Sequence, residues 1–124
     1  MSRIAMHIFR IQDKNGRGPF RPGFTIKWNE VREDTANLEP FYCEFPSFNA
    51  VNDVANNEHC GCACSTQKQL RRWFTEIEYR RLKELGYRAV KLKVNRILHE
   101  SEIQLIFTRK RALRKGATEI HLYI

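Results

Sequence analysis

The stretch from Cys60 to Phe107 constrains the fold of this chain more than any other part of the sequence. It opens with a short strand, CGCAC, and continues at about residues 67–85 with apolar side chains at helical spacing. Residues 88–94 (RAVKLKV) then largely alternate between apolar and basic side chains, which is typical of a strand with one buried face. An acidic run and a further strand, at about 103–108, complete the stretch.

Two capping signals predict where the helical segment begins and where it bends. In each, a threonine is followed three residues later by Gln or Glu: Thr66 with Gln69, and Thr75 with Glu78. We therefore expect two short helices, at about 67–73 and 76–85, joined at a bend. Gly86 can close the second helix, because glycine adopts the left-handed conformation that helix ends favour.

Strand patterns occur outside this stretch as well. Residues 4–11 (IAMHIFRI) carry apolar side chains on both faces, as an interior strand does, so we expect Arg10 where the core opens into a cleft or solvent. The last residues, EIHLYI, alternate too, whereas about 25–58 form an irregular insert with a short helix near 47–56. We predict a single α+β domain over 1–124, in which a small, mostly antiparallel sheet carries the helical segment.

The net charge of the chain is +8, and it is unevenly distributed. Residues 1–27 sum to +5, residues 28–60 to −6 and residues 61–124 to +9. A basic body of this kind attracts nucleic acid, nucleotide phosphates or an acidic protein, although a high charge also serves solubility alone. No apolar run approaches the roughly 20 residues of a membrane span. We therefore expect an anionic partner and no membrane.

One basic cluster is dense enough to be a candidate binding site. It combines a turn near the end of the chain with two lysines of the 88–94 strand: Arg109, Lys110, Arg111, Arg114, Lys115, Lys91 and Lys93. A phosphate backbone would be attracted to such a cluster. Because no aromatic side chain lies between Arg109 and Lys115, the pattern fits a charged turn before it fits a base-stacking surface.

The cysteines leave two interpretations open. With a neighbouring histidine, the candidates for zinc ligands are Cys43, His59, Cys60, Cys62 and Cys64. Three of them alternate along one strand, which cannot surround an ion alone, so we favour small thiols packed in the core and expect no metal. Same-strand cysteines pair poorly, which fits reduced thiols. The first residues, MSRIAMHIFR, lack the apolar core of a signal peptide, and we expect a cytoplasmic protein.

Glu100 and Glu102 lie just before or on a strand, and residues two apart in a strand project to the same side. Such a pair can hydrogen-bond ribose hydroxyls and stabilise a cationic sugar carbon, as in glycosidic cleavage. It also fits an ordinary solvated turn. Both interpretations stay open.

Several segments resemble small uncharacterised proteins of bacteriophages. They are the loop Gly16-Arg17-Gly18-Pro19-Phe20, the segment 62–70, the pair Trp73-Phe74 and the helix end at 82–87. In those proteins an RGPY-like loop precedes a segment like CGFASLEQL…WF and a helix end like LKELGY. The resemblance implies a phage protein that acts in the bacterial host cytoplasm, in the manner of an anti-defence, anti-CRISPR-like inhibitor.

The order of the elements is also similar to that of a reduced ADP-ribosyltransferase. The residues that this resemblance implies are Arg10, Arg17 and Phe20 for NAD binding, and Ser65, Glu100 and Glu102 for catalysis. Glu102 would bond the nicotinamide ribose and stabilise an oxocarbenium-like state. Glu100 would help to place the acceptor.

Two functions therefore remain. We favour a basic inhibitor that needs no cofactor and binds a host protein or nucleoprotein complex through its cationic residues, with direct nucleic-acid binding as a variant. The alternative is an NAD-dependent enzyme that ADP-ribosylates a host macromolecule.

Overall fold

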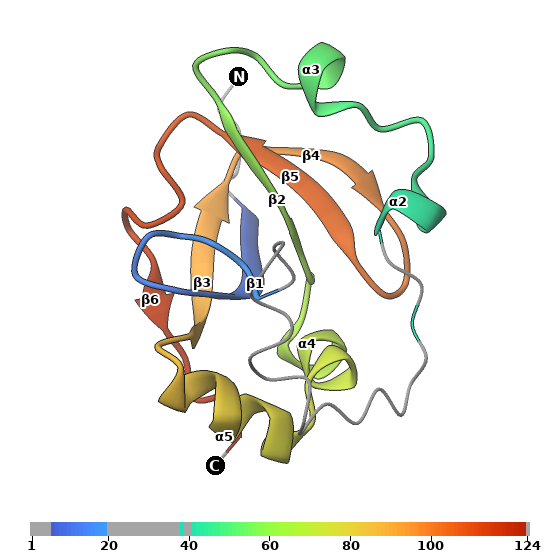
Figure 1. Ribbon diagram of the computed structural model, residues 1–124. Helices are drawn as coiled ribbons and strands as arrows, with labels where there is room; N and C mark the ends of the chain where they lie inside the picture. Colours follow the sequence, from blue (N-terminus) through green and yellow to red (C-terminus); the bar gives the residue numbers. More distant parts are fainter. Residues whose placement is uncertain (1–5, 20–37, 39–40, 124) are drawn as a thin grey trace.

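The computed structural model describes residues 6–19, 38 and 41–123 of the chain (Figure 1). The described residues form six strands, two four-residue helices and two longer, consecutive helices. In chain order the elements are β1 (Met6–Gln12), α2 (Phe41–Glu44), α3 (Ala50–Asp53), β2 (His59–Ala63), α4 (Gln67–Trp73), α5 (Glu76–Glu84), β3 (Arg88–Val94), β4 (Arg96–Glu100), β5 (Leu105–Arg109) and β6 (Thr118–Glu119).

The strands form two antiparallel three-stranded sheets, and this arrangement confirms the α+β class. One sheet has the order β1-β3-β6 and the other β2-β5-β4. Two backbone hydrogen bonds of 2.8 Å between Phe9 and Cys64 join β1 to the residue that follows β2. The sequence predicts one sheet, and the structure has two. They are separate because β4, which follows β3 after Asn95, pairs with β5 and not with β3.

The core has two parts, one on each face of the β1–β3 pair, because successive residues of a strand point to opposite faces. The cluster between the two sheets consists of Ile8, Ala63, Val90, Leu92, Val94, Leu105 and Phe107. The cluster beneath the helices consists of Ile11, Cys64, Leu70, Phe74, Tyr79, Leu82, Tyr87, Ala89 and Leu122. The helices α4 and α5 therefore cover one end of the outer face of β1 and β3 (Figure 1).

Both helices begin where the sequence predicts. The hydroxyl of Thr66 accepts a hydrogen bond from the N–H of Gln69, and that of Thr75 accepts one from Glu78. The side chains of Gln69 and Glu78 in turn accept a hydrogen bond from the backbone N–H of Thr66 and Thr75, respectively. Both capping boxes are therefore complete. Gly86 follows α5 with a φ of 96°, which glycine adopts readily. In the part of the chain that is described, no helix is long and apolar enough to cross a membrane.

Two strands differ from the sequence-based expectation. The sequence does not predict strand β4, and a register shift between Ile97 and His99 breaks its alternation. The alternating end of the chain forms only the two-residue β6, because Leu122 turns into the helical core. Alternation thus fails as a guide at a bulge and near a chain end.

The described part of the irregular insert contains two four-residue helices, α2 and α3. Asn49 caps α3 by accepting a hydrogen bond of 2.9 Å from the N–H of Val51, so the short helix expected near 47–56 is confirmed over fewer residues. Glu44 Oε1 accepts hydrogen bonds from Ser101 Oγ at 2.7 Å and Gln104 Nε2 at 2.9 Å, which hold α2 against the β4–β5 turn. Residues 25–37 of the insert lie outside the described residues.

Candidate functional site

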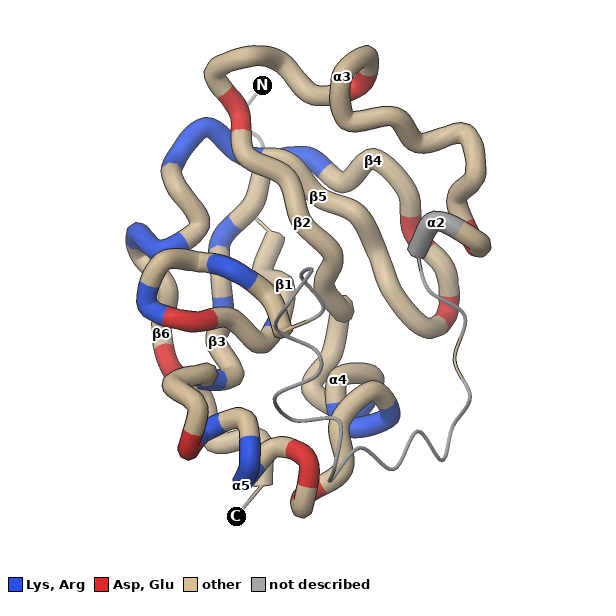
Figure 2. Tube along the Cα trace, viewed as in Figure 1, with Lys and Arg blue, Asp and Glu red and all other residues tan. Residues whose placement is uncertain are grey.

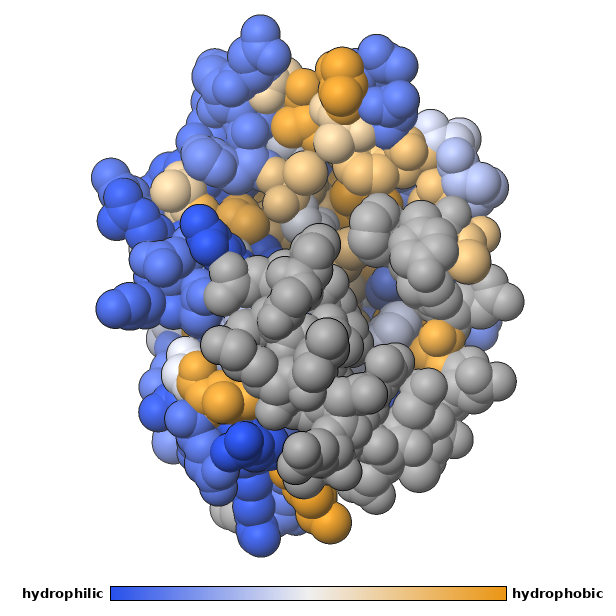
Figure 3. All heavy atoms as spheres, viewed as in Figure 1, coloured by the Kyte–Doolittle hydropathy of each residue, from blue (hydrophilic) through white to orange (hydrophobic). Residues whose placement is uncertain are grey.

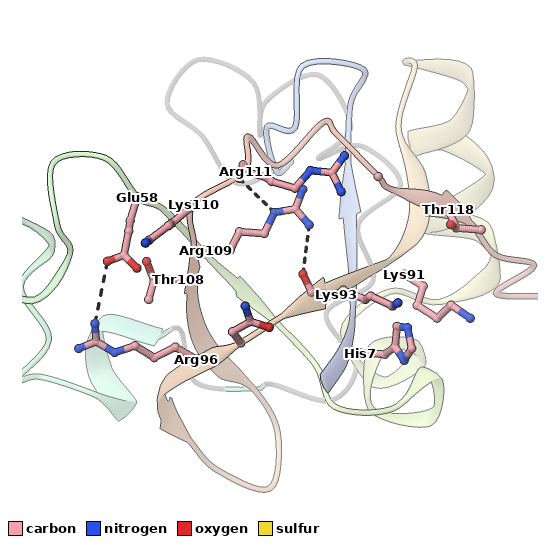
Figure 4. A pocket seen from close by; sticks show the side chains of 12 residues that line it. His7, Glu58, Lys91, Lys93, Arg96, Thr108, Arg109, Lys110, Arg111 and Thr118 are labelled. Carbon is pink, nitrogen blue, oxygen red and sulfur yellow. Dashed lines mark hydrogen bonds and ion pairs between the residues drawn. The ribbon is translucent and has the colours of Figure 1, made fainter. Parts of the chain in front are cut away.

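A groove of about 870 Å³ opens where the ends of β3 and β5 meet the loop between β5 and β6 (Figure 4). We call it the cationic groove, because six of its twelve lining residues are basic: Lys91, Lys93, Arg96, Arg109, Lys110 and Arg111. One lining residue, Glu58, is acidic. The groove therefore concentrates positive charge within a confined volume.

The register of the first sheet places the lysines of β3 in this groove. Lys93 lies opposite His7 of β1, and Lys91 lies opposite Thr118 of β6. Residues opposite one another on antiparallel strands share a face, so all four side chains lie on one side of the sheet. The alternation that buries Val90 and its neighbours in the core turns the two lysines outward.

Arg109 is the anchor of the groove. Its side chain is 8% exposed and donates hydrogen bonds to four backbone carbonyls: Arg111 at 3.0 Å, Lys93 at 3.2 Å, Ala112 at 2.7 Å, and Lys115. Burial lowers the pKa of Arg109, and the charge of Arg111 lowers it further. The guanidinium thus fixes the loop to β3, and four of its N–H groups are already engaged.

The other predicted cations divide between the groove and the surface beside it. Lys110 and Arg111 are exposed at the rim of the groove, whereas Arg114 and Lys115 are exposed but do not line it. Arg96 lies 3.9 Å from Glu58, so its charge is partly balanced. In Figure 2, Lys and Arg mark both β3 and the loop that leads into β6.

The surface around the loop is hydrophilic. On the face drawn in Figure 3, hydrophilic residues gather along the edge that carries β6 and the loop before it, whereas apolar residues gather around β2 and α3. The cationic groove therefore belongs to a polar side of the molecule.

Arg10, which the sequence places near a cleft or solvent, lies between the two sheets and is 8% exposed. Its guanidinium carbon is 5.7 Å from the centroid of the Phe107 ring. Burial lowers the pKa of Arg10 to about 10, and the nearby thiols of Cys62 and Cys60 act in the opposite direction. Among the described residues, its Nε and Nη1 atoms have no hydrogen-bond partner.

The glutamates suggested for catalysis lie elsewhere, at the β4–β5 turn. Ser65 Oγ donates a hydrogen bond of 2.5 Å to Glu100 Oε2, so the structure brings these two residues together. Glu102 is exposed, and its backbone carbonyl accepts a bond of 2.7 Å from Gln69 Nε2. Within the described chain, no hydrogen bond or ion pair joins Arg10 to either glutamate.

The other residues of the suggested NAD site are Arg17 and Phe20. Arg17 is exposed, and its backbone closes a turn in which its N–H donates a 2.9 Å hydrogen bond to Asp13 Oδ1. Phe20 lies outside the described residues.

The four cysteines are free thiols, and they range from exposed Cys43 to buried Cys64. Burial raises the pKa of Cys62 to about 11 and that of Cys64 to about 12, so both are protonated at neutral pH. Within the described ranges, no group of three or more His, Cys, Asp or Glu side chains could hold a metal ion.

Sequence reasoning missed the acidic Glu58 and four other polar residues of the groove: His7, Asn95, Thr108 and Thr118. The pairing of β1 and β6 with β3 places His7 and Thr118 beside the lysines of β3, whereas Asn95 comes from the turn after β3 and Thr108 from β5. Arg96 was missed because β4 was not expected. No local pattern in the sequence marks any of them.

The fold and the groove define a small basic α+β protein with a cationic groove at one end of its sheets. The chain belongs to the bacteriophage T4 Y00F protein family, whose model matches residues 6–121. This match confirms the expected relationship to small phage proteins. No curated protein and no solved structure matches the chain significantly.

Proposed function

We propose that this phage protein is a non-catalytic binding protein that occupies an anionic surface of a host complex in the bacterial cytoplasm, in the manner of an anti-defence inhibitor. The observation that carries the proposal is the cationic groove, in which six basic residues face one acidic residue. Its occupant is therefore expected to be anionic.

Two further features support binding through this groove. The net charge of +8 creates a field that speeds the approach of an anionic partner. The four carbonyl contacts of Arg109 hold the loop in place, so that little conformational entropy is lost when a partner binds. A preformed charged surface suits an inhibitor that has to compete for its target.

The test compares two double variants with the same change in net charge. Lys93→Glu/Arg111→Glu reverses two exposed cations of the groove, and Lys68→Glu/Arg72→Glu reverses two exposed cations of α4 that do not line it. Association with host complexes, measured by quantitative co-purification from infected cells, should be lost with the first variant and kept with the second. Equal association of both variants would contradict the proposal.

The alternative function is transfer of ADP-ribose from NAD to a host macromolecule. The hydrogen bond between Ser65 and Glu100 favours it, because it joins two of the residues that such a site would need. The burial of Arg10 between the sheets, away from the β4–β5 turn, weighs against it. Calorimetry with NAD, using Glu102→Gln as the control, decides: the absence of heat at millimolar NAD would exclude this function.

A further inference from the structure

Apart from Gly116, the residues that line the cationic groove are polar or charged. Besides the six basic residues and Glu58, it is lined by His7, Asn95, Thr108, Gly116 and Thr118. None of the twelve carries an aliphatic side chain or a Phe, Tyr or Trp ring. This composition limits the kinds of anionic partner that can bind in the groove.

An acidic protein surface fits poorly. Protein–protein interfaces draw most of their affinity from aromatic and apolar anchors buried at their centre. The groove offers no such anchor, and charge pairs at a wet surface contribute little by themselves. A protein partner would therefore have to bind mainly elsewhere.

A sugar–phosphate backbone fits well. Phosphate oxygens are contacted by Lys, Arg, Thr and Asn side chains, which are the types that line the groove. Lys91 and Lys93 are two residues apart on one strand face, which sets their Cα atoms about 6.6 Å apart. Successive phosphates of one duplex strand are about 3.4 Å apart along the helix axis, so two long lysine side chains at this spacing can contact nearby phosphates of the same strand.

Thr108 gives an independent indication that the floor of the groove can bind a polar ligand. It lines the groove and is 1% exposed. Among the described residues, its Oγ1 atom has no hydrogen-bond partner. A buried hydroxyl without a partner costs stability, and a phosphate oxygen would satisfy it.

We propose that the cationic groove binds the backbone of duplex nucleic acid without reading its sequence. The inference rests on the proposed function in one respect, since both assign binding to this groove. A duplex is favoured over a single strand because single-strand binders stack bases on aromatic rings, and His7 is the one ring in the lining. Four lining cations have no ion-pair partner among the described residues and are available for phosphates: Lys91, Lys93, Lys110 and Arg111.

The test is fluorescence anisotropy with short labelled duplexes of DNA and of RNA, each in two unrelated sequences, and with the matching single strands. With about four phosphates neutralised, log K should fall with log salt at a slope of roughly −3 to −4 between about 50 and 200 mM. Lys93→Gln should reduce that slope by about 1, equally for both sequences. Lys68→Gln, on α4, should leave it unchanged.

A second variant separates binding from folding. Thr108→Val removes the hydroxyl and keeps the shape, so it should leave the urea midpoint unchanged or higher and weaken duplex binding by about tenfold. The DNA and RNA arms identify which backbone is preferred. Single-strand binding as tight as duplex binding would overturn the inference, as would a slope that Lys93→Gln does not change.

The outcome also separates this inference from the proposed function. Absence of duplex binding at about 50 mM salt, together with loss of host association in Lys93→Glu/Arg111→Glu, would overturn nucleic-acid binding and leave the inhibitor proposal standing. Duplex binding that disappears in that variant, with host association unchanged, would overturn the proposed function alone.

Discussion

The guanidinium of Arg109 donates a hydrogen bond from Nη1 to the backbone carbonyl of Lys93 at 3.2 Å, and so ties the end of β5 to the end of β3. The same side chain bonds three carbonyls of the loop that follows. A buried cation thus organises the surface that carries Lys93, Lys110 and Arg111. In the binding that we propose, Arg109 serves mainly to position Lys110 and Arg111.

Replacing Arg109 should therefore destabilise the protein. Arg109→Lys keeps the charge, but one ammonium cannot reach all four carbonyls, and we expect a loss of about 2–4 kcal/mol in the free energy of unfolding. Urea denaturation measures it. The control Lys110→Gln, at an exposed position, should stay within about 0.5 kcal/mol of the wild type. An unchanged midpoint in Arg109→Lys would show that these hydrogen bonds do not hold the loop.

Gly61 should not tolerate a side chain. A Cβ at this position would lie 2.7 Å from Arg10 Nη1 and 3.2 Å from Phe107 Cε1, and Arg10 is buried between the sheets and cannot swing out. We expect Gly61→Ala to cost about 1–3 kcal/mol. Thermal unfolding provides the measurement.

A double-mutant cycle tests the cause of that cost. Arg10→Met removes the guanidinium, whose Nε and Nη1 lack hydrogen-bond partners in the described structure, so the single change should be near neutral or stabilising. Combined with Gly61→Ala, Arg10→Met should also restore most of the stability that Gly61→Ala loses, with a coupling energy above about 0.5 kcal/mol. Additive effects of the two changes would place the clash elsewhere.

Gln69 should matter more than an ordinary capping residue. Its Oε1 accepts from the N–H groups of Ser65 at 2.9 Å and Thr66 at 3.1 Å, and its Nε2 donates to the carbonyl of Glu102 at 2.7 Å. Gln69→Ala should cost about 1–2 kcal/mol, and Gln69→Glu, which keeps only the acceptor, a smaller amount. If Gln69→Ala unfolds at the same urea concentration as the exposed variant Lys68→Ala, the link to the β4–β5 turn contributes nothing.

The buried thiols predict a loss of stability at high pH. Burial raises the pKa of Cys62 to about 11 and that of Cys64 to about 12, from 9.0 in the unfolded chain. The folded state holds these protons more tightly, so their contribution is complete below about pH 9 and is lost as the pH rises through 11 and 12.

Urea denaturation between neutral pH and about pH 10.5 would measure this loss. Cys64→Ala should make the decline shallower, and Cys43→Ala, at an exposed position, should leave it as in the wild type. A decline that is the same in all three proteins would assign it to other groups.

The sequence by itself determined the features that depend on neighbouring residues. The capping boxes at Thr66 and Thr75 bond atoms three residues apart, so their residue types predicted both helices and the bend between them. The alternation of β3 likewise predicted that the strand face carrying Val90 is buried and that Lys91 lies on the opposite face. The segments that resemble small phage proteins predicted the relationship to phage proteins.

Tertiary structure alone decided the environment of Arg10 and the composition of the groove. The pairing of His7 with Lys93 joins parts of the chain that are 86 positions apart, and β5 has to pair with β2 before Phe107 can meet Arg10. Such contacts depend on the register of whole strands and on how two sheets share a core, and register is set by the burial of entire faces. No local pattern could therefore show that Arg10 lies in the interior while the cations of β3 and of the loop before β6 meet in one groove.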